Sequence, residues 1–435
     1  MKFTLLLSLA LATTTTLSRP SNASPLNEGG IGAVPLILNP SYKHNTPAHI
    51  QKLNKRYPNI KIKTGSGLLS AGTGKVGLVN VNPDLEYYGA VKVGTPPQTL
   101  HLTFDTGSSD IWFPTSTCST AACKAHTRFN PTKSSTYKKD SRPWAIKYGD
   151  GSSASGHLAS EIVNVGGEVQ VRQTVGLARN VSDEFRELPE DGIFGLGFGT
   201  LMSVKGVNTF MDNAIASSSS NNKTKSVLKQ PVVSVFLPSL RRNGGRNGHV
   251  LFGGIDHSRY TGSLHYVPVT HKGFWQVKLD AFKTPTTLTN TTTNNASNAG
   301  NKPRWTEFAT PKQDIILDTG TTLIILSTAA AQKIHSTIPG STLDPKLGYL
   351  VPCSLRNSPS SSAIGFKLNG KYFKIPVADL AFEAVDGKKG ETCLSGVQGG
   401  QTGLWILGDV FIKNNYCVFD HSPENPRIGL APLKY

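Results

Sequence analysis

The segment Leu102-Thr-Phe-Asp105-Thr-Gly-Ser-Ser109 recurs later in the chain as Ile315-Ile-Leu-Asp318-Thr-Gly-Thr-Thr322. In both copies an apolar run leads into an aspartate, a threonine, a glycine and two residues with hydroxyl groups. Each copy is followed further on by two apolar residues and a glycine, Ile193-Phe194-Gly195 and Ile406-Leu407-Gly408. The aspartate and that last glycine lie 90 positions apart in both copies, since 195 − 105 and 408 − 318 are equal. A repeat of this kind predicts two lobes that are built alike.

The repeated residue types suit a pair of carboxylates. An apolar strand brings each aspartate to its end, and the glycine permits a tight turn behind it. Two carboxylates within about 3 Å of each other cannot both ionise, so they share one proton and titrate as a unit. One can then activate a water molecule while the other protonates the carbonyl oxygen of a peptide bond. We therefore predict that Asp105 and Asp318 are catalytic, and that the hydroxyls of Ser108 and Thr321 donate to their carboxylates.

Most of the chain has the pattern of short strands. Apolar and polar residues alternate in runs such as 88–93, 100–104, 232–236 and 373–377, which glycine, proline, asparagine and serine separate. Alternation with a period of two at such short spacing predicts a mostly β protein. Helices should be few and short, with 328–336 as one candidate. At 435 residues the chain should form two folding units rather than one.

Together these segments resemble the pepsin family of aspartic endopeptidases, and the resemblance covers about residues 76–435. The run 104–112 is similar to the family's first active-site segment, and 316–322 is similar to the second. Tyr148-Gly-Asp-Gly-Ser152 resembles the tip of the flap, a hairpin that closes over substrate. The runs 191–197 and 406–411 look like the strands behind the two active-site loops. The stretch 148–156 resembles that of secreted mucoralean fungal members, the rhizopuspepsin type.

The resemblance implies a mostly β, bilobal fold with two repeated β-barrel-like lobes and a central cleft. We expect a signal peptide at 1–23, a propeptide at 24–70, an N-terminal lobe with Asp105 and the flap at 71–245, and a C-terminal lobe with Asp318 at 246–435. The implied activity is hydrolysis of internal peptide bonds at acid pH, with large apolar residues preferred around the scissile bond. The resemblance implies no cofactor and no metal.

The resemblance also assigns contacts with an extended peptide. The residues concerned are Gly107, Trp112, Tyr148, Asp150, Gly151, Ile193, Gly320 and Thr322. Among them, Tyr148 is expected to order the substrate and to bond toward Trp112. Ile193 should line the main apolar pocket, with Phe185 as a second candidate. In fungal relatives an acid at the position of Asp150 helps to accept lysine at the cleaved position, and the alternative here is an ordinary turn residue.

The N-terminal region has a composition of its own. Lys2, the apolar run 3–12 and the small residues that follow as far as Ala23 are typical of a signal peptide. Residues 24–70 are basic and almost free of acids, which fits a propeptide, although a basic linker is the alternative. We predict a secreted zymogen, with the vacuole as the alternative destination.

Lysines of such a propeptide could block the dyad at neutral pH. Lys61 or Lys63 is expected to pair with the carboxylates, with Lys55 less favoured, and Lys55-Arg56 is also a possible dibasic processing site. Acid would weaken this pairing, because it protonates the carboxylates. Maturation could be autocatalytic, driven by a convertase, or both.

Five cysteines are present, and none has metal-ligand spacing. In an oxidising compartment the simplest arrangement pairs Cys118 with Cys123 and Cys353 with Cys393, and the pepsin family places disulfides at these positions. Cys417 is then left as a buried, inert thiol. Export would also make four sequons available for glycosylation: Asn180, Asn222, Asn290 and Asn295.

The formal net charge of +17 could indicate a nucleic-acid or membrane partner. Residues 1–70 contain eight Lys/Arg and one acid, so 45 − 8 and 28 − 1 leave 37 against 27, or +10, for 71–435. Those remaining bases are scattered, without a basic helix or a base-stacking platform. We therefore predict no nucleic-acid and no membrane partner. The expected partners of this monomer are protein or peptide substrates, pepstatin-type inhibitors and its own propeptide.

Two other classes of protein compete with this interpretation. A pepsin-fold binding protein without catalysis would usually show a damaged dyad, whereas both Asp-Thr-Gly segments are intact. A nucleotide-binding enzyme could be argued from Gly72-Thr-Gly-Lys-Val-Gly77. That match lacks a strand before it and a helix after it, which the dinucleotide fingerprint requires.

Overall fold

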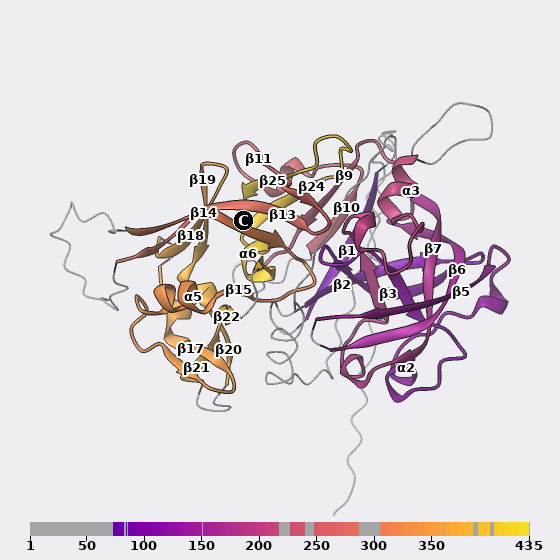
Figure 1. The fold of residues 1–435 in the computed structure, drawn as a ribbon, viewed down its shortest axis with the longest axis horizontal. Coiled ribbons are helices and arrows are strands. Elements are labelled where there is room, and N and C mark those ends of the chain that lie inside the picture. Colours follow the sequence, from indigo (N-terminus) through magenta and orange to yellow (C-terminus); the bar gives the residue numbers. More distant parts are fainter. Residues whose placement is uncertain are drawn as a thin grey trace, which may run out of the picture. The chain divides into compact units, whose positions relative to one another are not determined.

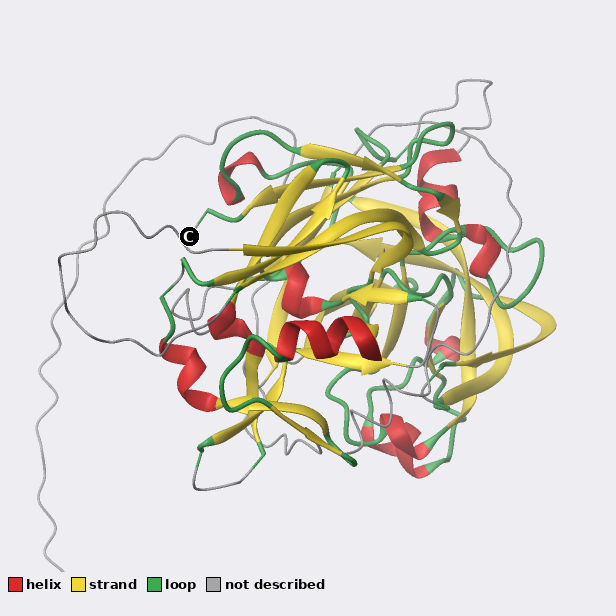
Figure 2. Cartoon of the chain, turned by 60° about the vertical axis from the view of Figure 1, so that its left-hand side comes forward, coloured by secondary structure: helices red, strands yellow, loops and turns green. Residues whose placement is uncertain are grey.

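A computed structural model of the chain describes residues 73–81, 84, 86–149, 151–216, 227–239, 248–286, 305–359, 361–385, 390–400 and 404–434. The expected signal peptide and propeptide lie outside the described residues, as do Asp150, Asn222, Asn290 and Asn295. None of the helices in the described ranges has the length and hydropathy needed to span a bilayer. The expected mostly β, two-lobed architecture of the pepsin type is confirmed, and strands are the main secondary structure in Figure 2.

The largest sheet has 13 strands and joins residues from both sides of the expected boundary at 245 and 246 (Figure 1). Its strands, in spatial order, are β11 (His265–Pro268), β25 (Arg427–Pro432), β24 (Asn415–Asp420), β9 (Val232–Phe236), β10 (Gly248–Phe252), β1 (Gly74–Val81), β2 (Glu86–Val93), β3 (Gln98–Asp105), β8 (Gly192–Gly195), β4 (Ile111–Pro114), β7 (Val169–Val181), β6 (Ser153–Val165) and β5 (Lys138–Lys147).

Two smaller sheets belong to the second half of the chain. The eight-stranded sheet runs β19 (Lys371–Pro376), β18 (Ala363–Leu368), β13 (Trp275–Pro285), β14 (Trp305–Leu317), β23 (Trp405–Leu407), β15 (Ile324–Ser327) and β22 (Val397–Gly400), and β12 (His271–Lys272) pairs with β13. The four-stranded sheet runs β16 (Thr342–Asp344), β17 (Gly348–Pro352), β21 (Thr392–Ser395) and β20 (Ala381–Ala384). From Trp275 to Ala281, alternating side chains on β13 are buried, as period-two patterning predicts.

The helices in the described ranges are short. They are α2 (Ala121–Ala125), α3 (Phe210–Ala216), α5 (Thr328–His335) and α6 (Asp409–Ile412), with 3-10 turns η1 (Pro131–Lys133), η2 (Asp183–Phe185), η3 (Gly199–Leu201), η4 (His257–Arg259), η5 (Cys353–Asn357) and η6 (Val377–Leu380). Helix α5 confirms the candidate 328–336, and its N-cap Ser327 accepts a hydrogen bond from the Ala330 amide. The expected strand at 406–411 is only partly right, because β23 ends at Leu407 and α6 begins at Asp409.

The sequence repeat is also a repeat of strand topology. In the first half β3 pairs in parallel with β8, which pairs antiparallel with β4, and β4 pairs in parallel with β7. In the second half β14, β23, β15 and β22 show the same three pairings in the same order. Each Asp-Thr-Gly segment therefore follows the first strand of an equivalent four-strand unit.

The cysteine predictions are confirmed. Cys118 bonds to Cys123, and Cys353 bonds to Cys393. Cys417 is a free thiol that is fully buried in β24, and burial raises the pKa of that thiol far above its usual value. A thiol in this state is not a nucleophile.

Candidate active site

Asp105 is the last residue of β3, and its buried carboxylate is held by the turn that follows it. The Gly107 amide donates to Oδ1 at 2.8 Å, and the Ser108 hydroxyl donates to Oδ2 at 2.5 Å. Behind the loop, the Leu196 amide donates to the Asp105 carbonyl at 2.7 Å. Hydrogen bonds to a carboxylate stabilise its charged form and fix its plane.

Asp318 follows β14 and has the same surroundings. The Gly320 amide donates to Oδ1 at 2.9 Å, and the Thr321 hydroxyl donates to Oδ2 at 2.6 Å. The Asp318 amide is bonded to the carbonyl of Leu407, in the backing strand β23. Each carboxylate thus receives one amide and one hydroxyl, from positions two and three residues later.

Two threonines connect the loops. The Thr106 amide donates to the Thr319 hydroxyl oxygen at 3.0 Å, and the Thr319 amide donates to the Thr106 hydroxyl oxygen at 3.0 Å. The Thr106 hydroxyl donates to the Leu317 carbonyl, and the Thr319 hydroxyl donates to the Phe104 carbonyl. All four bonds are buried, so they hold the two aspartates in a fixed relation without contacting either carboxylate.

Gly107 lies against the opposite carboxylate. A Cβ atom added to Gly107 would lie only 2.6 Å from Oδ1 of Asp318 and 2.8 Å from its Oδ2. No side chain fits at this position without moving the carboxylate. The glycine of the Asp-Thr-Gly segment is therefore required by the close approach of the two loops.

The segment 148–152 forms the tip of a hairpin between β5 and β6. Lys147 pairs with Ser153, the Tyr148 amide donates to the Ser152 carbonyl, and Gly151 adopts a positive φ of 91°. The Trp112 indole N–H donates to the Tyr148 hydroxyl oxygen at 2.7 Å. The hairpin tip is thereby tied to β4, which follows the Asp105 loop.

An apolar cluster surrounds Tyr148. The Phe185 ring packs edge-on against Trp112, with ring centroids 5.1 Å apart, and lies 6.1 Å from the Tyr148 ring. Ile193, in β8, belongs to the same cluster. The structure therefore brings together Trp112, Tyr148, Ile193 and Phe185, and Thr322 is buried beside α6, where the Val410 amide donates to its carbonyl.

Sequence reasoning missed the threonine links and one buried acid. The identical threonine after each aspartate was the available signal for the links. The acid is Asp110, which accepts a hydrogen bond from the Trp144 indole at 2.8 Å. Burial raises the pKa of Asp110 above its usual value, although hydrogen bonds from Ser203 and Trp144 act in the opposite direction. No linear pattern connects residues 110 and 144.

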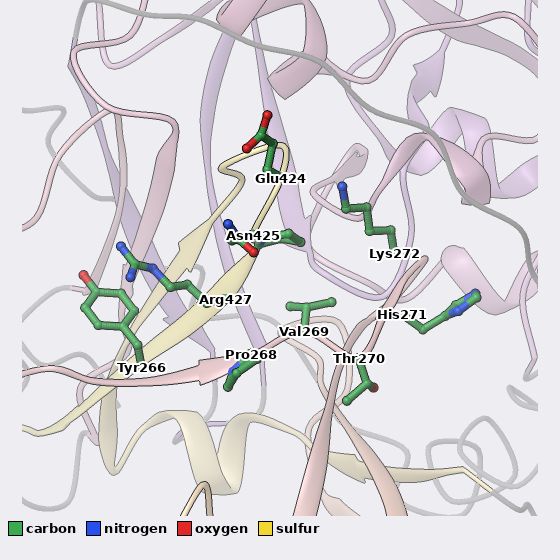
Figure 3. A pocket seen from close by; sticks show the side chains of 10 residues that line it. Tyr266, Pro268, Val269, Thr270, His271, Lys272, Glu424, Asn425 and Arg427 are labelled. Carbon is green, nitrogen blue, oxygen red and sulfur yellow. The ribbon is translucent and has the colours of Figure 1, made fainter.

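The described residues contain no group of three or more His, Cys, Asp or Glu side chains that could hold a metal ion. An open pocket of about 440 Å³ occurs elsewhere, and Figure 3 shows its lining residues, which come from 266–272 and 424–427. Its Arg427 is already bonded to Asp420 and stacked on Tyr266, and Lys272 donates to the Pro423 carbonyl. The cations of this pocket therefore have partners within the fold.

Comparison with known proteins agrees with this geometry. Residues 86–433 match the family model of eukaryotic aspartyl proteases. Rhizopuspepsin-1 of Rhizopus niveus is 38% identical over 436 residues, covering 100% of both chains. Syncephapepsin of Syncephalastrum racemosum is 35% identical over 98% of this chain and 99% of its own, and pepsin A of Canis lupus familiaris is 36% identical over 80% and 82%. The protein is an aspartic endopeptidase, and the chain belongs to the eukaryotic aspartyl protease family.

Proposed function

We propose that this protein is a secreted endopeptidase, made as an inactive zymogen, that hydrolyses internal peptide bonds at acid pH with Asp105 and Asp318 as its catalytic dyad. The observation that carries the proposal is the matched pair of loops. Both carboxylates have the same donors, and buried threonine bonds fix one loop against the other. A carboxylate pair needs this fixed relation before it can share a proton.

The chemistry is general acid–base catalysis by the shared-proton pair. The ionised carboxylate takes a proton from a water molecule as that water attacks the peptide carbonyl carbon, and the protonated carboxyl donates to the carbonyl oxygen. As the tetrahedral intermediate collapses, the carboxyl that took the proton from water passes it to the leaving amine, and the other carboxylate regains a proton from a hydroxyl of the intermediate. The dyad is then back in its starting state. Ser108 and Thr321 keep the two carboxyl groups oriented throughout, since each donates to an Oδ2 atom. Activity at acid pH follows, because the pair must keep one proton.

Substrate binds as an extended strand in this proposal. Gly107 and Gly320 offer backbone on the dyad side with Thr322, and Gly151 offers backbone from the hairpin tip. The preference for large apolar side chains follows from the cluster of Trp112, Tyr148, Ile193 and Phe185, which lies beside the Asp105 loop. Asp150, outside the described residues, would add acceptance of lysine.

Processing and export complete the proposal. Residues 1–23 direct secretion, with the vacuole as the alternative, and 24–70 block the dyad through Lys61 or Lys63. The mature enzyme, residues 71–245 and 246–435 as two lobes, acts as a monomer. Of the four proposed glycosylation sites, Asn180 lies exposed on β7, and the other three lie outside the described residues.

Hydrolysis of denatured haemoglobin or casein tests this function. Purified precursor is assayed from acid to neutral pH with and without pepstatin, beside the Asp105→Asn variant. We expect cleavage in acid that pepstatin and the substitution both abolish. A folded, processed protein that cleaved neither substrate at any acid pH would refute the proposal and favour a binding protein of the same fold.

A further inference from the structure

One of the two strands of the hairpin that carries Tyr148 is an edge strand of the large sheet. Strand β5 is the last strand of the large sheet, and among the described residues it pairs only with β6. Strand β6 is paired with β7 from Ala154 to Val165, so backbone bonds fix β6, whereas β5 and the tip are held by backbone bonds on one side only. Side-chain contacts must fix the hairpin if Tyr148 is to stay in one place, and the bond from Trp112 to Tyr148 is one of them.

Trp144 supplies a second anchor, four residues before Tyr148. Its indole is 2% exposed and donates to Oδ1 of Asp110 at 2.8 Å. The ring lies on Gly176 of β7, where an added Cβ would come within 2.5 Å of the indole Cε2 atom. Trp112 flanks the ring, with centroids 6.0 Å apart. The indole therefore has a fitted site, and the direction of its N–H is set by Asp110.

Asp110 is itself immobilised. The Ser203 amide and hydroxyl both donate to Oδ2, each at 3.0 Å, and the residue is 2% exposed. It comes five positions after Asp105, in the same loop. A chain of contacts thus runs from the Asp105 loop through the carboxylate and the indole into β5, and then to the hairpin tip.

The second copy of the repeat shows that this loop does not need an acid there. The offset between copies is 318 − 105, or 213, so Asp110 corresponds to Leu323. Leu323 is also 2% exposed and belongs to the hydrophobic core. In the second copy the apolar side chain of Leu323 fills this buried position. In the first copy the carboxylate of Asp110 fills it, and burying a carboxylate carries a desolvation cost. The fold alone therefore does not explain the acid at position 110. Its hydrogen bond to Trp144 indicates a role that only the first half has.

We propose that Asp110 is a positioning residue for the flap, which holds β5 and Tyr148 in register with the Asp105 loop through the Trp144 indole. This inference rests on the proposed function, because the flap matters only if the hairpin closes over substrate. Asp110 does not touch the reacting atoms. Its loss should therefore weaken substrate binding more than it slows the chemical step.

Steady-state kinetics on an extended peptide tests the proposal with three variants: Asp110→Leu, which copies Leu323, Trp144→Phe, which removes the indole N–H, and the double variant. We expect each single change to raise KM about 10-fold, the effect of losing a buried hydrogen bond and leaving one partner unsatisfied, with kcat changed less than about 3-fold. The double variant should be no worse than the poorer single one, since both changes break the same bond. Asp140→Asn, an acid on β5 bonded to Arg142, is the control and should leave KM unchanged.

Amide hydrogen exchange at 148–152 gives a readout that does not depend on activity. Exchange there should be faster in Trp144→Phe than in wild type, with exchange in β7 unchanged. The proposal is overturned if the effects of the single variants multiply in the double variant, or if thermal stability falls while KM and exchange stay at wild-type values. If Asp110→Leu does not fold, the KM and the amide exchange of Trp144→Phe test the proposal by themselves. An inactive wild-type enzyme would refute the proposed function. The exchange result would still show whether the bond between Asp110 and Trp144 holds the hairpin in place.

Discussion

The two aspartate loops surround their carboxylates in the same way and differ a few residues further along the chain. Both carboxylates accept from an amide and a hydroxyl, and each threonine bonds to the other loop. With the offset of 213, Trp112 of the first copy corresponds to Ile325 of the second, as Asp110 corresponds to Leu323. The first copy thus has two polar anchors for a hairpin where the second has aliphatic core. The repeat preserves the two carboxylates and their hydrogen-bond donors, whereas these hairpin anchors occur in only one copy.

The largest expected effect comes from either aspartate. Asp105→Asn and Asp318→Asn should each lower kcat/KM by about 10³-fold or more, because neither half can supply both the acid and the base. Cleavage of an extended peptide in acid measures this. Asp314→Asn, on the strand that leads to Asp318, is the control, since its carboxylate pairs with Lys278. Full activity in either aspartate variant would mean that the two copies do not act as one site.

Removing the hydroxyls sharpens the comparison. Ser108→Ala and Thr321→Val each delete one donor to an Oδ2 atom, so kcat should fall about 10-fold in each, with KM nearly unchanged. Equal losses would show that the two carboxylates are supported equally. If only one variant lost activity, the structural symmetry of the loops would not extend to their roles.

The threonine links should govern stability more than specificity. Thr106→Val and Thr319→Val each leave a buried amide and a buried carbonyl without their bonds, which should cost about 3 kcal/mol of unfolding free energy. Chemical denaturation measures the loss, in an Asp105→Asn background to prevent self-digestion. The four bonds divide between the two hydroxyls, which also contact each other at 3.4 Å, so the double variant should lose somewhat less than the sum. Additive losses would argue against one connected link.

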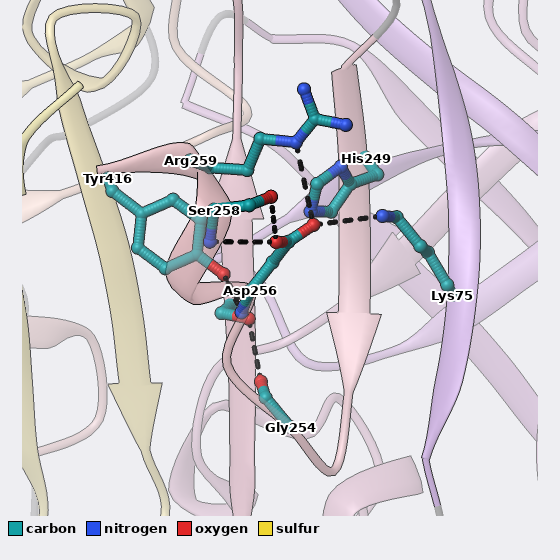
Figure 4. A network of polar contacts seen from close by, with 8 residues as sticks. Lys75, His249, Gly254, Asp256, Ser258, Arg259 and Tyr416 are labelled. Carbon is teal, nitrogen blue, oxygen red and sulfur yellow. Dashed lines mark hydrogen bonds and ion pairs between the residues drawn. The ribbon is translucent and has the colours of Figure 1, made fainter. Parts of the chain in front are cut away.

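Buried titratable groups also differ between the halves. Burial raises the pKa of Asp110 and Asp191 in the first half. In the second half burial lowers the pKa of three histidines: His335 to about 4, and His249 and His421 to about 3. Lys75 and Arg259 add to the effect on His249, and Figure 4 shows both beside the Asp256 carboxylate with His249.

These shifts act in opposite directions in acid. A histidine whose folded pKa lies below 6.5 contributes stability that is lost as pH falls from about 6.5 toward 4 or 3. An aspartate whose folded pKa lies above 3.8 destabilises the fold when ionised, and acid relieves this. The residues after 246 should therefore begin to exchange and unfold first as pH is lowered. Hydrogen exchange at a series of acid pH values measures this, and earlier opening of the first half would contradict it.

The contribution of one histidine can be tested by itself. His335→Gln should gain about 3 kcal/mol of unfolding free energy relative to wild type between pH 7 and pH 4, because only the wild-type protein has a buried imidazole that must stay neutral in acid. Denaturant titrations at the two pH values measure it, with exposed His257→Gln as the control. If the unfolding free energies of His335→Gln and wild type changed equally with pH, His335 would not contribute to the loss of stability in acid.

The geometry of the two aspartate loops is well predicted from the sequence, because the residues that form each loop are adjacent in the chain. Asp105 and Asp318, their hydroxyl partners and the hairpin at 148–152 all follow from short local patterns. Helix α6 was missed because apolar residues at 410–412 fit a buried strand as well as a short helix. The bond between Asp110 and Trp144 was missed because it depends on two strands meeting in space. Tertiary pairing of this kind leaves no periodic signal.

The pairing of β24 with β9 has a consequence for the order of folding. Cys417 lies opposite Val235, so these strands are 182 positions apart, and the Asp105 unit and β24 belong to one sheet. A ribosome must have added residue 420 before β9 can gain this neighbour. Strand β9 therefore lacks its neighbour β24 on one side until the second half of the chain has been synthesised. Such delayed closure favours slow folding, and it leaves an unpaired strand edge open to chaperones and to aggregation until the second half has been made.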